Sequence, residues 1–382
     1  MRPFAGAFWH RTAHGLGAAV VAVAIGTLAP RPSAQQATSS SLSFAALVER
    51  LSEPGGDFGG DNLISNEQSY LHVMPALERA RVSGGAYLGV GPDQNFSYIA
   101  QVKPEIAFII DIRRDNLLLH LLFKALFAIA PSRAEYLCAL TARPPPAQVE
   151  TWRDASIEKL VSYIDATPPQ AAAGQQQMRS RIDAAIERTG VSLTAGDRTT
   201  IRAFRQAFID RGLSLVFQVR GQGVRDYYPS LRDLLRETDL EGRQRSYLAS
   251  EPAFQVVRSL ESRDLIVPVV GDVSGPKAMR AIAAAMAARG ASLSAFYISN
   301  VEFYLSRDGR FPAFVENLKQ LPRTDRSTMI RSVFPGGFPG RVPLAVPGYY
   351  STSLIQPLDV MLADLASGKY RSYADLVYAS SR

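Results

Sequence analysis

The stretch Gly85–Asn116, GAYLGVGPDQNFSYIAQVKPEIAFIIDIRRDN, constrains the fold of this chain more than any other part of the sequence. It starts with a short apolar run, Ala86–Val90, and glycines follow at once. Asn95 can cap a helix that runs through Ala100. Ile106–Ile112 is a continuous apolar run rich in β-forming residues, which is typical of a strand buried on both faces. The stretch therefore predicts a strand, a glycine-rich turn, a helix and a second strand.

This arrangement suits the binding of a nucleotide or nucleoside. Gly89 and Gly91 would let the backbone approach a ligand closely, and Asp111 at the end of the next strand could accept hydrogen bonds from ribose hydroxyls. Asp111 follows Gly91 by 20 positions, which is the spacing expected in a nucleotide-binding βαβ unit. GVGPDQN lacks the third glycine of the dinucleotide fingerprint, so a ligand with a ribose and no phosphate fits better. S-adenosylmethionine is such a ligand.

Three segments carry a resemblance to known proteins: GGDNLISNEQSYLHV, YLGVGPDQNFSYIA and DIRRDNLLLHLLFKALF. Together they resemble an uncharacterised bacterial family that is described as methyltransferase-like, over about residues 55–130 and again around 265–335. The glycine turn and the acidic strand also resemble motif I and the following strand of class I S-adenosylmethionine-dependent methyltransferases. The resemblance implies a Rossmann-like fold, S-adenosylmethionine as cofactor, and a segment before the first strand that folds over the ligand as a lid.

Strands and helices alternate again in the last third of the chain. Three further buried strands are expected at Leu265–Val270, Leu293–Ser299 and Ser327–Val333, with helices between them at Pro276–Arg289 and Pro312–Leu321. Five strands joined by helices indicate an α/β protein with a doubly wound, mostly parallel, Rossmann-like sheet. In such a sheet the ligand binds at the carboxyl ends of the strands.

The strand ends therefore nominate residues for the site, namely Gly89, Gly91, Asp111, Asp272, Ser299, Asn300 and Glu302. By resemblance, Asp272 would contact adenine, and Asn300 or Glu302 would face the methyl acceptor. SNVEFYL differs from the Asn-Pro-Pro-aromatic motif of amino-methylating enzymes. The first strand also lacks the acid that usually precedes the glycines. Asp93 or Glu67 would then have to bind the amine of the methionine moiety.

Residues 35–84 are expected to form the N-terminal lid and helices, with a helix that begins at Ser65 or Asn66 and ends at Leu77. Asn66 and Glu67 are candidates for polar contacts to the ligand, as are Asp61, Asn62 and Tyr70. The alternative is that these residues only build a turn and a helix cap. His72 could act as a general base because its intrinsic pKa is suitable, or it could be a packed histidine. His72 and Glu302 are the candidate acceptor-side catalytic groups.

The chain is expected to divide into the lid, two halves of the Rossmann-like domain at 85–130 and 261–382, and a mainly helical insertion at 131–260. The insertion has connectors rich in Pro, Gln and Ala, helical segments with Thr194 as a cap, and a β-like run at Leu213–Val219. It could shape a substrate site, cover the sheet or form a dimer surface. Helices are expected at Leu354–Leu365 and Tyr373–Tyr378. The sequence does not indicate an oligomeric state.

Residues 1–34 are expected to be a signal peptide, with basic residues, an apolar run at Leu16–Ala29 and a small-residue cleavage site before Gln35. The apolar run is short for a transmembrane helix, so no stable membrane span is expected after cleavage. The predicted location is the periplasm or beyond, or the cytoplasm if the start or the signal is wrong. Because S-adenosylmethionine is cytoplasmic, the alternative function is an exported, non-catalytic protein that binds a small ligand.

Composition excludes several kinds of site. The net charge is +7, three arginines before Ala34 contribute part of it, and no run rich in Lys and Arg occurs, so no nucleic-acid partner is expected. Cys138 is the single cysteine, which excludes an intramolecular disulfide and a cysteine-based zinc site. Only His72 and His120 follow the signal segment, so no metal site is predicted. A hydrolase is disfavoured because GxSxG is absent.

Overall fold

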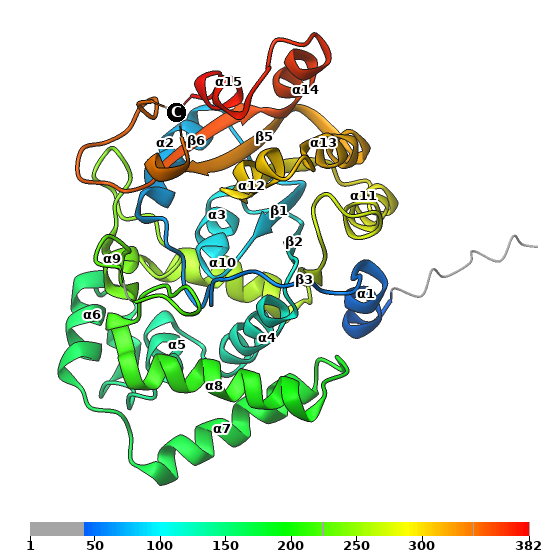
Figure 1. Ribbon diagram of the computed structural model, residues 1–382. Coiled ribbons are helices and arrows are strands. Elements are labelled where there is room, and N and C mark those ends of the chain that lie inside the picture. The colour runs from blue at the N-terminus through cyan, green and yellow to red at the C-terminus, as the bar shows by residue number, and fades with distance from the viewer. Residues whose placement is uncertain (1–41, 224, 339, 382) are drawn as a thin grey trace, which may run out of the picture. The chain divides into compact units, whose positions relative to one another are not determined.

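A six-stranded sheet forms the centre of the protein in a computed structural model that describes residues 42–223, 225–338 and 340–381 (Figure 1). The predicted signal peptide at residues 1–34 lies outside these residues. The strand order is β3-β2-β1-β4-β5-β6; the first five are parallel, and β6 is antiparallel to β5. The strands are β1 Ala86–Val90, β2 Ile106–Asp111, β3 Ile266–Val270, β4 Leu293–Ser299, β5 Arg323–Val333 and β6 Thr352–Pro357.

The central strands are buried along their whole length, as their apolar sequences predict. Every residue of β1 and β3 is buried, and only the last residue of β2, Asp111, is partly exposed. Leu88 of β1 lies opposite Phe108 of β2 and Phe296 of β4, so bulky apolar residues sit side by side across the sheet. The predicted α/β class with a mostly parallel, doubly wound sheet is confirmed.

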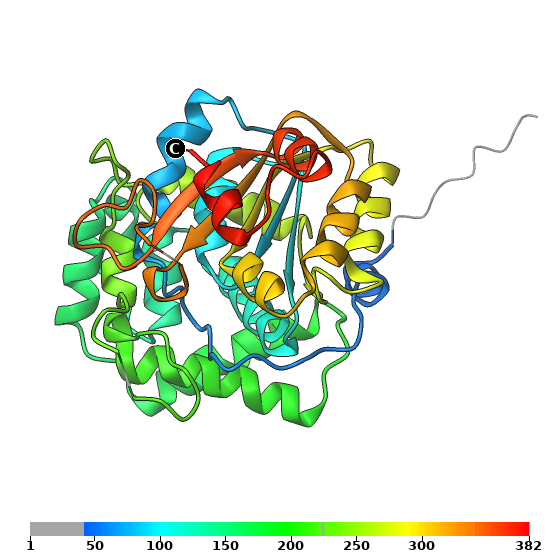
Figure 2. The same cartoon turned by 45° about the horizontal axis from the view of Figure 1, so that its top comes forward.

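Helices cover both faces of the sheet (Figures 1 and 2). On one face lie α3, α4 and α10: α3 contacts β1 and β4, α4 contacts β2 and β3, and α10 packs on both helices. On the other face lie α11 and α13, and α1 packs against β3 and α11 at the edge. The bounds of these helices are α1 Phe44–Leu51, α3 Gln94–Val102, α4 Arg114–Ile129, α10 Glu251–Ser262, α11 Ala278–Ala288 and α13 Phe311–Gln320.

The direction of the strand order changes between β1 and β4. The chain builds β1, β2 and β3 toward one edge and then returns to place β4 on the other side of β1. In open α/β sheets, ligands bind at the carboxyl ends of the strands at such a switch point. Gly91 follows β1, and Asn300 follows β4, so both predicted site residues lie at this point.

The helical insertion follows α4 and packs against it. Its helices α7 and α8 both contact α4, and they lie beside each other in Figure 1. Thr194 caps α8 as predicted, because its side chain accepts from the Asp197 amide while the Asp197 carboxylate accepts from the Thr194 amide. The helices are α5 Arg133–Leu140, η2 Val149–Trp152, α6 Ile157–Ala166, α7 Ala172–Glu187, α8 Ala195–Arg211, η3 Gly212–Ser214 and α9 Leu231–Arg236.

Three local predictions were wrong. The predicted helix Leu354–Leu365 is the strand β6 followed by α14 Leu358–Ala366, because residues 352–357 pair with β5 and cover its free edge. Leu213–Val219 is not a strand of the sheet; it makes only isolated bridges, Val216 to Ser230 and Val219 to Gly60. The helix expected to start at Ser65 or Asn66 is instead η1 Gln68–Val73 followed by α2 Met74–Arg79.

Short helices complete the C-terminal half: α12 Val301–Arg307 directly after β4, η4 Pro335–Gly337, and α15 Tyr373–Tyr378 at the predicted position. No helix within the described ranges is long and apolar enough to cross a bilayer.

Candidate functional site

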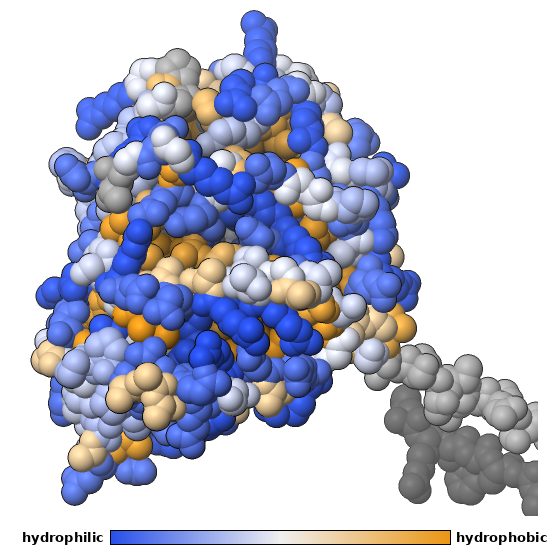
Figure 3. All heavy atoms as spheres, turned by 60° about the horizontal axis from the view of Figure 1, so that its bottom comes forward, coloured by the Kyte–Doolittle hydropathy of each residue, from blue (hydrophilic) through white to orange (hydrophobic). Residues whose placement is uncertain are grey.

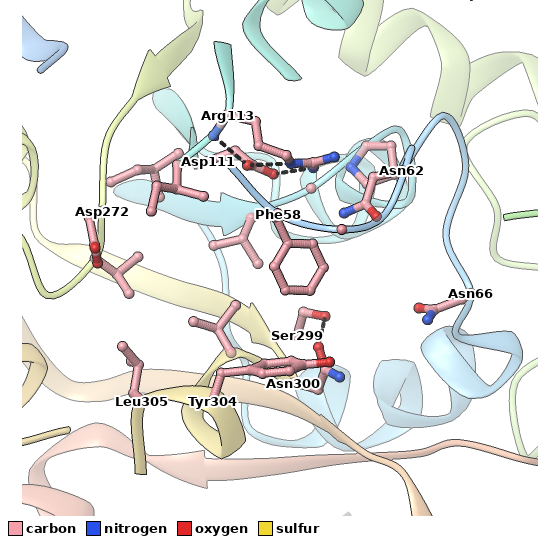
Figure 4. Close-up of a pocket in the computed structure, with 18 of the residues that line it drawn as sticks. Phe58, Asn62, Asn66, Asp111, Arg113, Asp272, Ser299, Asn300, Tyr304 and Leu305 are labelled. Carbon is pink, nitrogen blue, oxygen red and sulfur yellow. Dashed lines mark hydrogen bonds and ion pairs between the residues drawn. The ribbon is translucent and has the colours of Figure 1, made fainter. Parts of the chain in front are cut away.

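A cavity of about 400 Å³ opens at the carboxyl ends of β1 to β4 (Figure 4). Residues 53–67, here called the lid, pass over these strand ends and contribute Phe58, Asn62, Asn66 and Glu67 to its wall. The strand ends and the loops that follow them contribute Gly91, Gln94, Asp111, Arg113, Asp272, Ser299, Asn300, Tyr304 and Arg310. Eight of the residues nominated from the sequence thus line one cavity: Asn62, Asn66, Glu67, Gly91, Asp111, Asp272, Ser299 and Asn300.

The start of the lid is attached to the strand ends through its backbone. The Glu53 amide donates to the Val270 carbonyl at 2.9 Å, and the Gly56 amide donates to the Ile112 carbonyl at 2.7 Å. The Glu53 carboxylate also accepts from the amides of Lys277 and Ala278, both at 3.1 Å, at the N-terminus of α11. Such a contact satisfies amides that have no partner inside the helix. The lid is therefore held in place before any ligand binds.

Asn95 organises the glycine turn. The sequence predicted it as a helix cap, but it lies inside α3, where its amide donates to the carbonyls of Val90 at 2.9 Å and Pro92 at 2.8 Å. Gly89 does not line the cavity, contrary to the prediction. A Cβ at Gly89 would occupy the space of Asn95 Oδ1 and lie 2.8 Å from the Tyr87 hydroxyl, so Gly89 makes room for the asparagine.

Gly91 does line the cavity and has φ +84°, a conformation that glycine adopts without strain. Its carbonyl accepts from His120 Nε2 at 2.9 Å. Burial lowers the pKa of His120 to about 4, so its ring is neutral and Nε2 carries the proton that it donates. His120 is thus a buried histidine of the core, and its hydrogen bond fixes the turn.

Asp111 forms a bidentate ion pair with Arg113. Arg113 Nε donates to Oδ1 at 3.0 Å and Nη2 donates to Oδ2 at 2.7 Å, and the Arg113 amide also donates to Oδ1 at 2.9 Å (Figure 4). Arg113 Nη1 donates to the Gly60 carbonyl at 3.0 Å. The neighbouring Arg114 also pairs with an acid, Asp197, at 2.9 Å. One arginine therefore links the expected ribose acid to the lid.

The opposite wall of the cavity follows β3 and β4. Asp272 accepts from the amide and hydroxyl of Ser274, both at 2.8 Å, and forms an ion pair with Arg310. Ser299 has φ +56°, which is uncommon for a residue other than glycine and is typical of strained functional positions. Phe58 of the lid projects between the two walls and meets Tyr304 edge-to-face, with 5.4 Å between ring centroids (Figure 4).

Glu67 is a buried carboxylate at the cavity wall. It accepts hydrogen bonds from the hydroxyls of Tyr297, Ser299 and Ser332. Burial raises its pKa, and these three donors oppose that rise. Gln94 Nε2 donates to the same Tyr297 hydroxyl at 3.1 Å. The Oε1 atom of Gln94 is also buried, and it has no hydrogen-bond partner among the described residues. Two acceptor groups from distant segments thus meet at the cavity wall.

Asp93, Glu302 and His72, which the sequence also nominated, lie away from the cavity, as Gly89 does. Asp93 accepts from the Tyr247 hydroxyl at 3.2 Å on the side of α10, and burial raises its pKa to about 6. Glu302 is fully buried and pairs with Arg331, with Nε and Oε2 2.6 Å apart. His72 is buried against Tyr349 and lies 3.9 Å from Glu237. The prediction that Glu302 and His72 face a methyl acceptor in this cavity was therefore wrong.

Sequence reasoning missed Phe58, Gln94, Tyr304 and Arg310. A signal existed for Phe58, because it is an aromatic residue between two glycine pairs in GGDFGG, where no buried element would hold it. Gln94 and Arg310 gave no signal, since their direction depends on how α3 and α13 start. No group of three or more His, Cys, Asp or Glu suited to a metal ion occurs in the described part of the chain.

A comparison with curated proteins finds no match to this sequence. A family model described as a domain of unknown function, DUF7790, matches residues 63–164 and 173–381. The matched ranges include Glu67, Gly91, Asp111 and Asp272, whereas Phe58 and Asn62 precede them. Most of the residues that line the cavity therefore lie within the matched ranges, and the chain belongs to the DUF7790 family of domains of unknown function.

Proposed function

We propose that this protein binds S-adenosylmethionine in the cavity beneath the lid and transfers its methyl group to an acceptor. The observation that carries the proposal is that Gly91 and Asp111, which follow β1 and end β2, line one cavity at the switch point of the sheet. A glycine turn and an acid in this relation suit the binding of a nucleoside, and the cavity volume of about 400 Å³ lies in the range of small-molecule sites.

Asp111 would bind the ribose. A carboxylate has about four acceptor positions, and Arg113 with its own amide uses three of those of Asp111. The remaining acceptor position would receive a ribose hydroxyl, and the arginine fixes the orientation of the carboxylate. Phe58 and Tyr304 would supply apolar contact to the purine, and Asp272 with Arg310 would border its polar edge.

Glu67 and Gln94 would bind the ammonium group of the methionine moiety. The strand before the glycines has no acid, and Asp93 faces Tyr247, so the lid carboxylate is the remaining candidate of the two named from the sequence. An ammonium group donates three hydrogen bonds. Here it would donate to the Glu67 carboxylate and to Gln94 Oε1, which has no partner among the residues that the structure describes. The positive charge of the ligand would also favour the ionised form of Glu67.

The methyl transfer itself needs little help from side chains. The sulfonium is already activated, so holding the acceptor in line with the methyl group and excluding water supply most of the rate. The lid, which covers the strand ends, suits this task. The absence of Glu302 and His72 from the cavity wall therefore does not oppose a methyltransferase.

A second candidate function is the binding of a nucleoside-like ligand without catalysis. The specific observation in its favour is that neither expected acceptor-side group, Glu302 or His72, lines the cavity. The predicted signal peptide also favours it, since an exported protein would have no supply of S-adenosylmethionine.

Calorimetric titration tests the proposal. S-adenosylmethionine and its demethylated product are titrated into the protein and into Asp111→Asn, which keeps the shape of the side chain. Asp115→Asn is the matched control, because Asp115 lies in the first turn of α4 and is solvent-exposed. We expect micromolar affinity that Asp111→Asn weakens by about tenfold or more and that the control leaves unchanged. No heat at millimolar ligand with a folded protein would contradict the proposal.

The two candidate functions differ in turnover. If a bound S-adenosylmethionine carrying a labelled methyl group transfers its label in a bacterial extract, the methyltransferase function holds. Binding without label transfer favours the non-catalytic protein.

A further inference from the structure

A second cavity, of about 190 Å³, lies in the helical insertion between α4, α7 and α8. Leu122, Ile182, Ile201 and Ile209 give it an apolar side. Arg179, Arg202 and Arg205 give it a basic side. Figure 3 views the molecule from below Figure 1, and the surface there is mostly hydrophilic, with hydrophobic side chains visible in the hollows between polar ones. This cavity shares no residue with the one beneath the lid.

Arg205 is the unusual member of this cavity. Its side chain comes from α8, and only 7% of the residue is exposed. Its Nε and Nη2 atoms are buried and have no hydrogen-bond partner within the described ranges of the chain. Burial, together with the like charge of Arg179, lowers the pKa of Arg205 to about 10, which still leaves it protonated at neutral pH. Asp183 attracts this charge from a distance, yet no acceptor among the described residues bonds to Nε or Nη2. Buried donors without an acceptor are costly, and an anionic ligand would supply the acceptors.

The two unpartnered atoms lie on the same edge of the guanidinium. The same edge of other arginines in this protein binds carboxylates, as three examples show. Arg114 pairs with Asp197 through Nε and Nη2, both at 2.9 Å, and Arg232 pairs with Asp165 at 2.9 and 2.8 Å. Arg113 holds Asp111 in the same way. The Nε–Nη2 edge of Arg205, which has no partner in the described part of the chain, therefore has the geometry to donate to two oxygens of one anionic group.

The charges around Arg205 also favour an anion. Arg179 donates a hydrogen bond to the amide oxygen of Gln176, and Arg202 pairs with Asp183 at 3.0 Å. Asp183 is the one carboxylate among the described residues that line this cavity, against three arginines. A net positive wall beside an apolar wall suits an anion that carries a small apolar body.

We propose that this cavity binds a small organic oxyanion, with two oxygens on the Nε–Nη2 edge of Arg205 and its apolar body against Leu122 and Ile182. A carboxylate and a phosphate monoester share the oxygen geometry that this edge recognises. The volume of about 190 Å³ limits the ligand to a body of a few carbon atoms. The site is independent of the proposed methyltransferase function.

The test uses hexanoate and phenyl phosphate as probes, with hexanol as the neutral probe. The full protein is titrated by calorimetry and its melting temperature is followed at millimolar probe. We expect one or both anions to bind and to raise the melting temperature, while hexanol does neither. The anion that binds more tightly identifies the source of the charged group. Arg205→Gln should weaken anion binding by about tenfold or more.

Arg198→Gln is the matched control, because Arg198 is on the same helix and is solvent-exposed. It should bind the anions as the wild type does. A second variant, Arg205→Met, supplies a measurement that needs no ligand. Since it removes an unpaired buried charge, its melting temperature without anion should equal or exceed that of the wild type. Equal binding by wild type and Arg205→Gln, no binding of either anion, or a lower melting temperature for Arg205→Met would overturn the proposal.

Discussion

Glu67 and Asp93 show how two carboxylates near the same glycine turn acquire different roles. Glu67 lines the cavity and accepts from three hydroxyls, whereas Asp93 accepts from Tyr247 on the side of α10. The sequence nominated both to bind the methionine amine, Asp93 from the glycine turn and Glu67 from the lid. It could not separate them, since the direction of a side chain at the start of a helix depends on the packing of elements distant in sequence.

Asp93 should make the stability of the protein depend on pH. Burial raises its pKa to about 6 from 3.8, so the folded state binds its proton more tightly than the unfolded state. The stability that this proton contributes is present below pH 3.8 and is lost as the pH rises through about 6. We expect Asp93→Asn to gain about 2 kcal/mol relative to wild type when the pH rises from about 4.5 to about 7.5. Urea unfolding of both proteins at the two pH values measures this difference.

The comparison of variant and wild type at each pH removes the contributions of other groups. The buried His120, whose pKa is lowered to about 4, acts in the opposite sense in both proteins. A difference between the two proteins that is constant from acid to neutral pH would show that Asp93 has an ordinary pKa.

Gly89→Ala should destabilise the protein strongly. The added Cβ would lie where Asn95 Oδ1 now lies and 2.8 Å from the Tyr87 hydroxyl. Relief would have to break the hydrogen bonds that Asn95 makes to the turn, so we expect a loss of about 2–3 kcal/mol in the free energy of unfolding. Gly223→Ala is the control, because a Cβ there meets no atom within 4 Å. Equal unfolding midpoints for the two variants would contradict this account of the turn.

At the scale of elements, the five parallel strands were predictable and β6 was not. Continuous apolar runs such as Leu293–Ser299 are buried on both faces, so the sequence gives them a clear pattern. TSLIQP is short, and LIQPLDVMLADL has the spacing of a helix, which masks the strand before Pro357. What fixes β6 is its pairing with β5, from Thr328 opposite Pro357 to Val333 opposite Thr352. That is a contact between segments, and a local pattern does not contain it.

Residues 213–219 are the opposite case, a strand predicted from a local pattern that does not join the sheet. The run LSLVFQV has β-forming residues, yet it contributes only isolated bridges and places Phe217 in the cavity wall. The run pairs with the lid at Gly60 and with Ser230 before α9, and not with either edge strand of the sheet. Tertiary contacts therefore override propensity here.

At the scale of the whole molecule, the sequence predicted at which edge of the sheet the site lies, but not the full set of side chains that line it. Parallel strands end on one side of a sheet, so Gly91, Asp111, Asp272 and Asn300 had to come together there. Glu302 is only two positions beyond Asn300, but α12 turns it away from the cavity and into the core. Because α12 begins directly after β4, Glu302, which was nominated as a catalytic residue, has a structural role in the core.

The Glu302–Arg331 pair joins parts of the molecule that are distant in sequence. Arg331 of β5 bonds Glu302 of α12 at 2.6 and 3.2 Å, Gln356 of β6 at 2.9 Å, and the hydroxyl of Ser380. Both charged side chains are fully buried. In such a place the attraction of the pair offsets its desolvation, whereas one charge left alone is strongly destabilising.

A double-mutant cycle on this pair tests both its structural role and its exclusion from the site. We expect Glu302→Leu and Arg331→Met each to cost about 3–5 kcal/mol in the free energy of unfolding, because each leaves a buried charge unpaired. The double variant leaves no such charge, so its cost should be well below the sum of the two. Urea unfolding measures all four proteins, and additive losses would mean that the two charges do not stabilise each other.

The same variants distinguish a core residue from an acceptor-side group. Glu302 does not line the cavity beneath the lid, so the double variant, if folded, should bind S-adenosylmethionine with the affinity of the wild type and turn it over at the same rate. A double variant that keeps its stability and its affinity but loses methyl transfer would show that Glu302 takes part in the reaction. That outcome would require α12 to rotate during turnover, because the carboxylate in this structure is fully buried and paired with Arg331.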